Sequence, residues 1–76
     1  MMEIKPGIYR HYKGYDYEVI DMAIHSETLE ELVLYRPLYG EKKLWVRPSS
    51  MFLERLLVEG RTVTRFEYIG EATDKG

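Results

Sequence analysis

The segment YDYEVIDMAIH, at residues 15–25, sets the shape of the predicted sheet through its pattern of apolar residues. In its first half the large apolar residues alternate with polar ones, at Tyr15, Tyr17 and Val19. In its second half they alternate on the opposite parity, at Ile20, Met22 and Ile24. A β-bulge between Val19 and Asp21 would bring both sets to one face, because a bulge adds one residue to a strand and bends it. We therefore predict one long strand, bent enough for a small sheet to curl into a barrel.

Turn signals on both sides of this segment divide the rest of the chain into short strands. Lys13-Gly14 and Glu59-Gly60 are typical of tight hairpin turns, and Pro48 cannot donate a hydrogen bond to a ladder. The expected strands cover residues 8–12, 15–25, 32–36, 44–47, 53–58 and 62–69. Residues 49–52 are expected to form one short helical turn. This order predicts an all-β fold, a small SH3-like barrel of five to six strands, and the alternative is an OB-type barrel, which usually needs a longer chain.

The chain is expected to form one small domain. It has 76 residues and no cysteine, so its stability must rest on apolar burial rather than on disulfides. We assign residues 5–70 to this domain and expect loose tails at 1–4 and 71–76. The expected core consists of Val19, Met22, Leu34, Val46, Phe52, Val63 and Phe66. Because the sequence shows no signal-like start and no run of about 20 apolar residues, we expect a cytoplasmic protein without a membrane partner.

Charge is distributed unevenly along the sequence. The formal net charge of -2 argues against indiscriminate binding to phosphate backbones, because such affinity comes from many released counterions. Positive charge is nevertheless concentrated in residues 32–47, where Arg36, Lys42, Lys43 and Arg47 face Glu41 alone. A basic stretch that also holds aromatic residues could contact an anionic partner. A solvated hairpin without a partner is the alternative.

The aromatic residues are the most informative feature for function. Seven tyrosines, two phenylalanines and one tryptophan are more rings than so small a core is expected to hold, because buried tyrosine hydroxyls need a hydrogen-bond partner. Some rings are therefore expected on the surface, where small barrels bind extended ligands. We predict a binding surface that consists of Arg36, Tyr39, Trp45 and Arg47, with His11 and Tyr12. In the alternative, Trp45 and half of the tyrosines cover a thin barrel wall, and the arginines bridge to Glu27 or Glu31.

Catalytic and metal-binding patterns are weak in this sequence. Residues 25–27, His-Ser-Glu, place three catalytic residue types side by side, but neighbours on a strand point to opposite faces. Closure of a turn by Ser26 or Thr28 explains them more simply, and residues 26–31 form either a tight loop or one helical turn. His11 and His25 lack the short spacing of metal ligands, and the glycines stand singly. We therefore expect no catalytic residues, no metal site and no cofactor.

Four runs of the chain carry a resemblance to a known family. They are KPGIYRHYKG at 5–14, HSETLEELVLYRPLYG at 25–40, LWVRPSSMFLE at 44–54 and RFEYIG at 65–70. These runs resemble a bacterial family known as a domain of unknown function, number sixteen-fifty-three, over nearly the whole chain. The resemblance implies an SH3-like barrel and a bacterial source. It implies no activity and no catalytic residues, because the family has none assigned.

Three classes of function follow from these observations. We favour a non-enzymatic binding module whose partner is a protein segment, including a second copy in a homodimer, or a single-stranded nucleic acid. Nucleic-acid binding, as an RNA or single-stranded DNA accessory domain, predicts an affinity that falls steeply with salt, whereas binding to a protein should survive salt. A small enzyme or metal site, the least favoured class, requires His11 and His25 within reach of each other.

Overall fold

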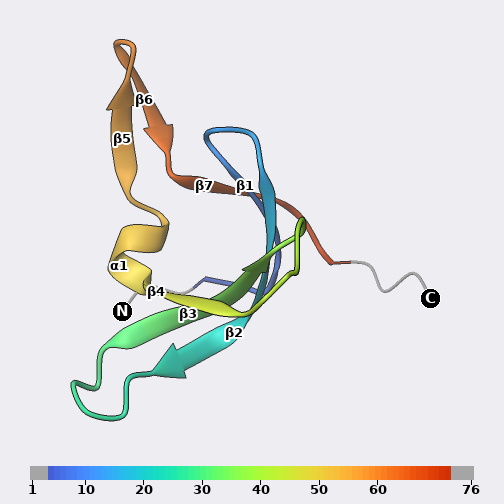
Figure 1. Cartoon of the computed structure of the whole chain (residues 1–76). Coiled ribbons are helices and arrows are strands. Elements are labelled where there is room, and N and C mark those ends of the chain that lie inside the picture. The colour runs from blue at the N-terminus through green and yellow to red at the C-terminus, as the bar shows by residue number, and fades with distance from the viewer. Residues whose placement is uncertain (1–3, 73–76) are drawn as a thin grey trace.

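The computed structural model describes residues 4–72, which form seven strands and one short helix (Figure 1). The elements in chain order are β1 (Gly7–His11), β2 (Asp16–Ile24), β3 (Glu31–Pro37), β4 (Trp45–Pro48), α1 (Ser49–Phe52), β5 (Arg55–Val58), β6 (Arg61–Thr64) and β7 (Phe66–Gly70). Five strands form one antiparallel sheet in the order β4-β3-β2-β1-β7, and β5 pairs with β6 in a separate hairpin. The predictions of an all-β fold and of a helical turn at residues 49–52 are confirmed.

The predicted bulge in the long second strand is present. The pairing of β2 with β3 shifts between Val19 and Asp21, so that Ile20 has no partner in the register. The extra residue places Met22 on the same face as Val19, where Val19 is buried and Met22 packs against the core. Because a bulge increases the local bend and twist, β2 curves as it crosses the sheet (Figure 1).

The five-stranded sheet is curled but open. Its edges are β4 and β7, which do not pair with each other in the part of the chain that the structure describes, so the strands do not close into a ring. The single strand predicted at residues 62–69 is interrupted at Arg65. Residues before the interruption pair with β5 in a hairpin that projects away from the sheet, and residues after it pair with β1 (Figure 1). One predicted strand therefore serves two sheets.

The core lies on the concave face of the sheet, beneath α1, and it is mainly aromatic. Its buried residues are Ile4, Tyr9, Tyr17, Val19, Val33, Tyr35, Phe52 and Phe66. Phe52 of α1 stacks on Phe66 of β7, with 4.2 Å between the ring centroids. Each buried tyrosine places its hydroxyl beside a partner: Tyr9 donates to the carbonyl oxygen of Lys5, and the other two hydroxyls are bonded within the surface described below. Satisfied hydroxyls explain how a small core holds three tyrosines.

Three members of the predicted core were assigned incorrectly. In β3 the inward positions are those of Val33 and Tyr35, so Leu34, which alternates with them, lies on the outer face. Val46 of β4 pairs with Leu34 and is 56% exposed for the same reason. Val63 lies in the projecting hairpin and is only half-buried. For Leu34 and Val46 the error is a shift by one residue, which exchanges the two faces of a strand, whereas Val63 belongs to a hairpin outside the main sheet.

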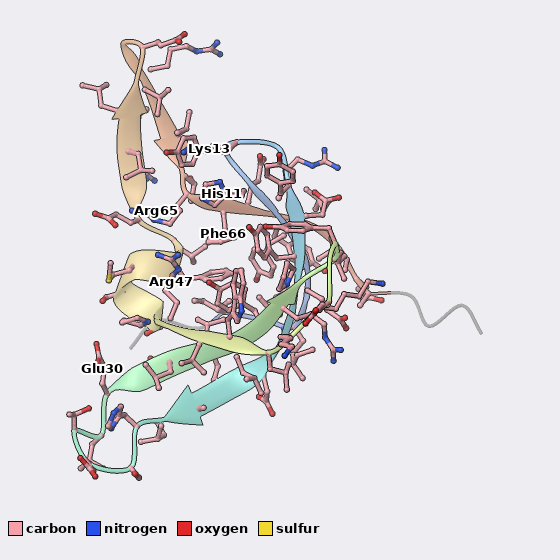
Figure 2. The ribbon with its side chains drawn as sticks, viewed as in Figure 1. His11, Lys13, Glu30, Arg47, Arg65 and Phe66 are labelled. Carbon is pink, nitrogen blue, oxygen red and sulfur yellow. The ribbon has the colours of Figure 1, made fainter. Side chains whose placement is uncertain are left out.

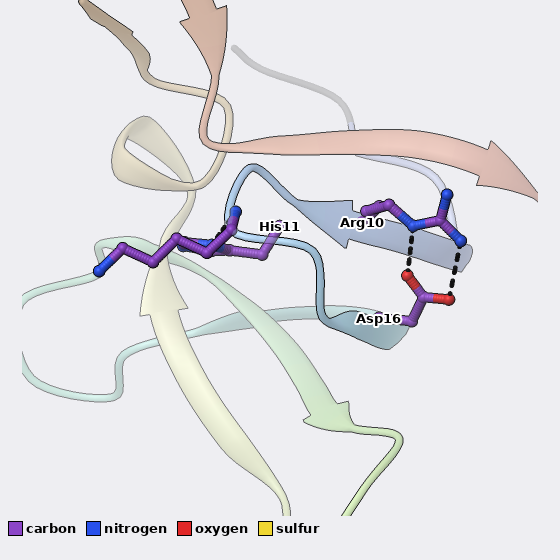
Figure 3. Close-up of polar contacts among 4 residues, drawn as sticks. Arg10, His11 and Asp16 are labelled. Carbon is purple, nitrogen blue, oxygen red and sulfur yellow. Dashed lines mark hydrogen bonds and ion pairs between the residues drawn. The ribbon is translucent and has the colours of Figure 1, made fainter. Parts of the chain in front are cut away.

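Ion pairs occupy the outer face of the sheet. Arg10 of β1 donates to both carboxylate oxygens of Asp16 of β2, at 2.8 and 3.2 Å (Figure 3). The hydrogen bonds from Arg10 lower the pKa of the Asp16 carboxyl. Farther along β2, Glu18 lies 3.9 Å from Arg36 of β3, within ion-pair range but beyond hydrogen-bonding distance, which leaves the buried Nε of Arg36 without an acceptor among the described residues. These pairs sit on the side opposite the aromatic core.

The loop between β2 and β3 is closed by its own side chains. His25 accepts hydrogen bonds at Nδ1 from the backbone amides of Glu27 and Thr28, and the Thr28 hydroxyl accepts one from the amide of Glu30. Of the predicted segment 26–31, residues 26–28 form a single turn inside this tight loop, closed by the Leu29 amide, which donates to the carbonyl oxygen of His25 at 2.8 Å, and Glu31 already belongs to β3. The prediction that Thr28 closes a turn onto a backbone amide is confirmed, and His25 accepts two further backbone hydrogen bonds in the same loop.

The described part of the N-terminal tail is ordered by the core. Ile4 was assigned to the loose tail at 1–4, but its side chain is buried with Tyr9 and Phe52 in the core cluster. An apolar side chain gains free energy by covering the open end of a small core, and this corrects the predicted boundary. Residues 1–3 and 73–76 of the two predicted tails lie outside the described residues.

Candidate binding surface

Seven rings follow one another across the concave side of the sheet, and we call them the ring face. They are His11, Tyr12, Tyr17, Tyr35, Tyr39, Trp45 and Phe66. The ring centroids of Tyr12 and His11 are 4.6 Å apart, and those of His11 and Phe66 are 4.9 Å apart. Beyond Phe66 the row continues through Tyr17, whose hydroxyl lies 3.0 Å from that of Tyr39. Phe66 meets His11 and Tyr17 edge-to-face, and Tyr17 meets Tyr39 in the same way, an arrangement that holds rings in defined positions.

Strand register explains why these rings share one side. His11 of β1 stands opposite Phe66 of β7, and Tyr35 of β3 stands opposite Trp45 of β4. Residues directly opposite each other in an antiparallel pair place their side chains on the same face. Because β1 and β2 also pair in register, Tyr17 lies between these two couples.

The ring face consists of a buried floor and an exposed rim. Tyr17, Tyr35 and Phe66 are buried, whereas Tyr39 and Trp45 are 44% and 45% exposed. Burial raises the pKa of Tyr17, and its hydrogen bond with Tyr39 raises it further, so the hydroxyl stays protonated. Tyr39 and Trp45 also line a small cleft of about 230 Å³ together with Pro37, Gly40, Glu41, Lys42 and Lys43. The rim rings are therefore accessible while the floor keeps them in place.

Arg47 of β4 lies on the ring face. Its Nε donates to the Tyr35 hydroxyl at 3.3 Å, and its guanidinium carbon lies 6.0 Å from the centroid of Phe66. Within residues 4–72 no carboxylate lies in ion-pair range of Arg47. A cation over an aromatic floor without a counter-charge can accept an anionic ligand group.

Two more cations lie at the same end of the ring face. Arg65, at the break between β6 and β7, donates from Nη2 to Glu54 at 3.0 Å, while its buried Nε has no acceptor among the described residues. Lys13, in the turn after β1, donates its backbone amide to Nδ1 of His11 at 3.1 Å. Figure 2 shows Lys13, His11, Arg65, Phe66 and Arg47 between the β1–β2 turn and α1.

His11 reports on this concentration of positive charge. Its pKa is lowered first by burial and then by the charges of Arg65, Lys13 and Arg47. The neutral ring accepts at Nδ1, so its proton resides on Nε2, which can donate to a ligand. The electrostatic potential around His11 is therefore positive.

The lowered pKa of His11 predicts an acid sensitivity. The unfolded chain binds a proton at His11 near its usual pKa of 6.5, and the folded chain binds it only at lower pH. The contribution of His11 to the free energy of unfolding should be fully present above pH 6.5. It should be lost as the pH falls below that value, because the unfolded state binds the proton first. Urea unfolding at about pH 7.5 and about pH 5.5 measures this effect. Between the two pH values the free energy of unfolding should fall less for His11→Asn than for the parent. Equal losses of unfolding free energy in the parent and in His11→Asn would contradict this assignment.

The structure places five of the six predicted surface residues on one side. His11, Tyr12, Tyr39 and Trp45 belong to the ring face, and Arg47 lies beside it. Arg36 lies on the outer face, where it pairs with Glu18, because it alternates with Tyr35 along β3. The bridges to Glu27 or Glu31, which were the alternative for both arginines, are absent among the described residues.

Two cations of this surface, Arg65 and Lys13, were not predicted from the sequence. Arg65 was hidden inside a strand predicted to be continuous, and the break at its position is set by pairing with two different strands. Lys13 was assigned only to a turn, which it does occupy, and its proximity to His11 follows from the tightness of that turn. No local pattern could have placed these cations beside Arg47, which is distant in sequence.

Residues 4–72 show neither a group of metal ligands nor a membrane-spanning helix. Across residues 4–72, no three His, Asp or Glu side chains come together as a metal site would require. His11 and His25 lie beyond opposite ends of β2. No helix within the same range is long and apolar enough to span a bilayer.

Comparisons with known proteins agree with the fold. A crystal structure of a protein of the DUF1653 family from Bordetella bronchiseptica superposes with a TM-score of 0.84 at 32% sequence identity, and the match covers 96% of each chain. None of the curated proteins compared with the chain matches it. The model of DUF1653, described as a protein of unknown function, matches residues 7–68. The chain therefore belongs to the DUF1653 family.

Proposed function

We propose that this domain is a non-enzymatic binding module and that the ring face holds single-stranded nucleic acid. The observation that carries the proposal is the combination of two exposed rim rings, Tyr39 and Trp45, with an arginine that has no carboxylate partner in residues 4–72. Unpaired bases stack on such rings whatever their sequence, and nearby cations neutralise the backbone. The net charge of -2 is compatible with this reading, because the binding charge is local.

Several features of the ring face suit an extended ligand that carries flat rings, such as the bases of a single strand of nucleic acid. The floor rings Tyr17 and Tyr35 support the rim from below, so stacking would cost little side-chain entropy. Lys42 and Lys43 beside the rim cleft supply positive charge for the backbone, with Glu41 paired to Lys43 at 3.4 Å. A ligand that crosses from the rim cleft toward Arg47 would meet rings and cations in turn.

A protein segment is the second candidate partner, favoured by the edge strand β4. This strand has one open side and carries the exposed side chains of Trp45 and Val46. An added strand could pair with its backbone, and a second copy of the chain could do so in a homodimer. This candidate predicts binding that survives high salt.

Anisotropy titration with fluorescein-labelled DNA and RNA strands of mixed sequence tests the proposal. Removing one stacking ring costs about 1–3 kcal/mol, so Trp45→Ala should weaken binding about tenfold or more. Val46→Ala, the neighbouring residue that points to the outer face, is the matched control and should leave affinity unchanged. Neutralising about three phosphates should lower affinity about tenfold between about 50 and about 200 mM salt. Equal affinities for the two variants, or no salt dependence, would refute nucleic-acid binding by this face.

A further inference from the structure

We propose that Arg47, Arg65 and His11 form an anion subsite at one end of the ring face and that it takes the terminal phosphate of a bound nucleic-acid strand. The proposal rests on the function proposed above and names the end of the ligand that the site selects. It concerns a part of the surface distinct from the Tyr39 and Trp45 rim.

His11 and Arg47 lie around the Phe66 ring, and Arg65 is its neighbour in the chain. The His11 ring lies 4.9 Å from the centroid of Phe66, and the guanidinium carbon of Arg47 lies 6.0 Å from it. Arg65 directly precedes Phe66 in the chain, at the break between β6 and β7. Because Phe66 is buried and stacked on Phe52, the groups around it rest on a rigid apolar floor. Figure 2 shows them along the same side of the molecule.

This cluster holds hydrogen-bond donors without acceptors. Among the described residues, the guanidinium of Arg47 makes a single hydrogen bond, from Nε to the Tyr35 hydroxyl, and so keeps both terminal nitrogens for a ligand. The buried Nε of Arg65 has no acceptor within the same residues. His11 carries its proton on Nε2, because Nδ1 accepts the Lys13 amide. The donors open to an anion are the terminal nitrogens of Arg47 and Nε2 of His11, whereas the Nε atoms of Arg65 and of Arg36 on the outer face are both buried without a partner in residues 4–72.

The charge balance of the cluster favours an anion. Glu54 offsets Arg65 at 3.0 Å, but no carboxylate of residues 4–72 offsets Arg47 or Lys13 within ion-pair range. The pKa of His11 is lowered first by burial, and the charges of Arg65, Lys13 and Arg47 lower it further. An anion between these cations would relieve the repulsion among them, and the apolar floor strengthens the attraction by lowering the local dielectric constant.

A terminal phosphate fits the cluster better than an internal one. A phosphate monoester carries about -1.5 to -2 charges near neutral pH and has three acceptor oxygens, whereas a diester within a strand carries one charge. The planar guanidinium of arginine can donate two parallel hydrogen bonds to two oxygens of such a phosphate. Arg47 stands two residues after Trp45 on β4, a separation of about 7 Å along the strand. A phosphate at Arg47 would thus leave the adjoining nucleotide within reach of the exposed Trp45 ring.

NMR titration of the full chain with inorganic phosphate tests the subsite alone. At constant ionic strength, phosphate should shift the signals of His11, Arg47 and Arg65 and should raise the pKa of His11. The cations that act on this imidazole are Arg47 from β4, Arg65 from the β6–β7 break and Lys13 from the turn, and the rings of Tyr12 and Tyr17 pack beside it. Arg10 of β1 and Glu67 of β7 line a pocket together with His11, and Glu54 pairs with Arg65, so the Glu67 and Glu54 carboxylates are the acids beside the subsite. Arg47→Gln should weaken phosphate binding at least tenfold, and Arg36→Gln, on the outer face, should not change it. Phosphate shifts that are equal in the two variants would overturn the subsite.

Short strands with and without a terminal phosphate separate the subsite from the proposed function. A strand phosphorylated at its 5′ or 3′ end should bind about tenfold more tightly than the same strand with hydroxyl ends, and Arg47→Gln should abolish the difference. Equal binding of all strands at Trp45 would overturn the subsite and leave the proposed function standing. Specific phosphate binding at Arg47 without any oligonucleotide binding would support the anion site but would overturn both its assignment to a nucleic-acid end and the proposed function.

Discussion

Replacing Phe52 with alanine is expected to leave the domain largely unfolded at room temperature. Phe52 is fully buried, stacks on Phe66 at 4.2 Å, and meets the rings of Tyr9 and Tyr35 edge-on at 5.4 Å each. Removing a buried phenylalanine costs about 3–5 kcal/mol, because the transfer free energy is lost and a cavity remains. A core of this size supplies about 3–5 kcal/mol of net stability in total, so the two amounts nearly cancel.

Urea unfolding followed by circular dichroism measures this effect. Met51→Ala is the matched control, because Met51 precedes Phe52 in α1 but is 42% exposed. This control should change the free energy of unfolding by about 1 kcal/mol or less. A Phe52→Ala variant as stable as Met51→Ala would show that α1 does not cover the sheet as described.

Gly7→Ala should also destabilise the domain strongly, for a reason located in the backbone. Gly7 has φ +146°, a conformation that side-chain-bearing residues rarely adopt. A Cβ atom there would lie 2.7 Å from Cε1 of Tyr68 and 2.8 Å from the carbonyl oxygen of Gly70, both closer than contact permits. The carbonyl belongs to the neighbouring strand β7 and cannot rotate away. Backbone strain and overpacking together should cost about 3 kcal/mol or more.

Gly14→Ala distinguishes the two contributions to that cost. Gly14 also has a positive φ, +105°, but a Cβ atom there meets nothing within 4 Å. Its substitution should cost about 1–2 kcal/mol from backbone strain alone. Thermal unfolding of both variants provides the comparison. If Gly7→Ala is no less stable than Gly14→Ala, the close approach of β1 to β7 at this point is wrong.

The parts of the fold that could be predicted from the sequence are those encoded locally. The apolar residues of β2 change from one alternation to the other, and this change identified the bulge between Val19 and Asp21. In a strand with one buried face, the positions of the apolar residues show which side chains point inward. The helical turn and the β5–β6 hairpin were likewise marked by Pro48 and by Glu59-Gly60. The split between β6 and β7 could not be predicted, because it depends on which distant strand each half meets.

The face of β3 shows how composition misled the prediction of the core. Leucine is a common core residue, so Leu34 was placed inside, yet Val33 and Tyr35 face inward. Tyr35 can face inward because its hydroxyl accepts a hydrogen bond from Arg47 of the adjacent strand. A buried tyrosine is acceptable only when such a partner exists, and the partner is visible only in three dimensions. The same contact joins the core to the candidate site.

Much of the candidate site was within reach of sequence reasoning, and part of it was not. An excess of rings in a short chain predicted rings on the surface, and Tyr39 and Trp45 are exposed beside Arg47. Arg36 resembles Arg47 in sequence context, since each precedes a proline, but alternation along the strand sends the two guanidinium groups to opposite faces. Register, rather than residue type, separates a ring-face cation from an outer-face ion pair.

Residue-resolved NMR titration with mixed-sequence RNA and single-stranded DNA, at low and at high salt, tests the binding proposal most directly. At low salt the signals of His11, Tyr39, Trp45 and Arg47 should shift together. Signals of the outer face, with Arg36 as the reference, should stay in place, and the shifts should vanish at high salt. Absence of any shift, or shifts centred on Arg36 and the outer face, would contradict nucleic-acid binding by the ring face.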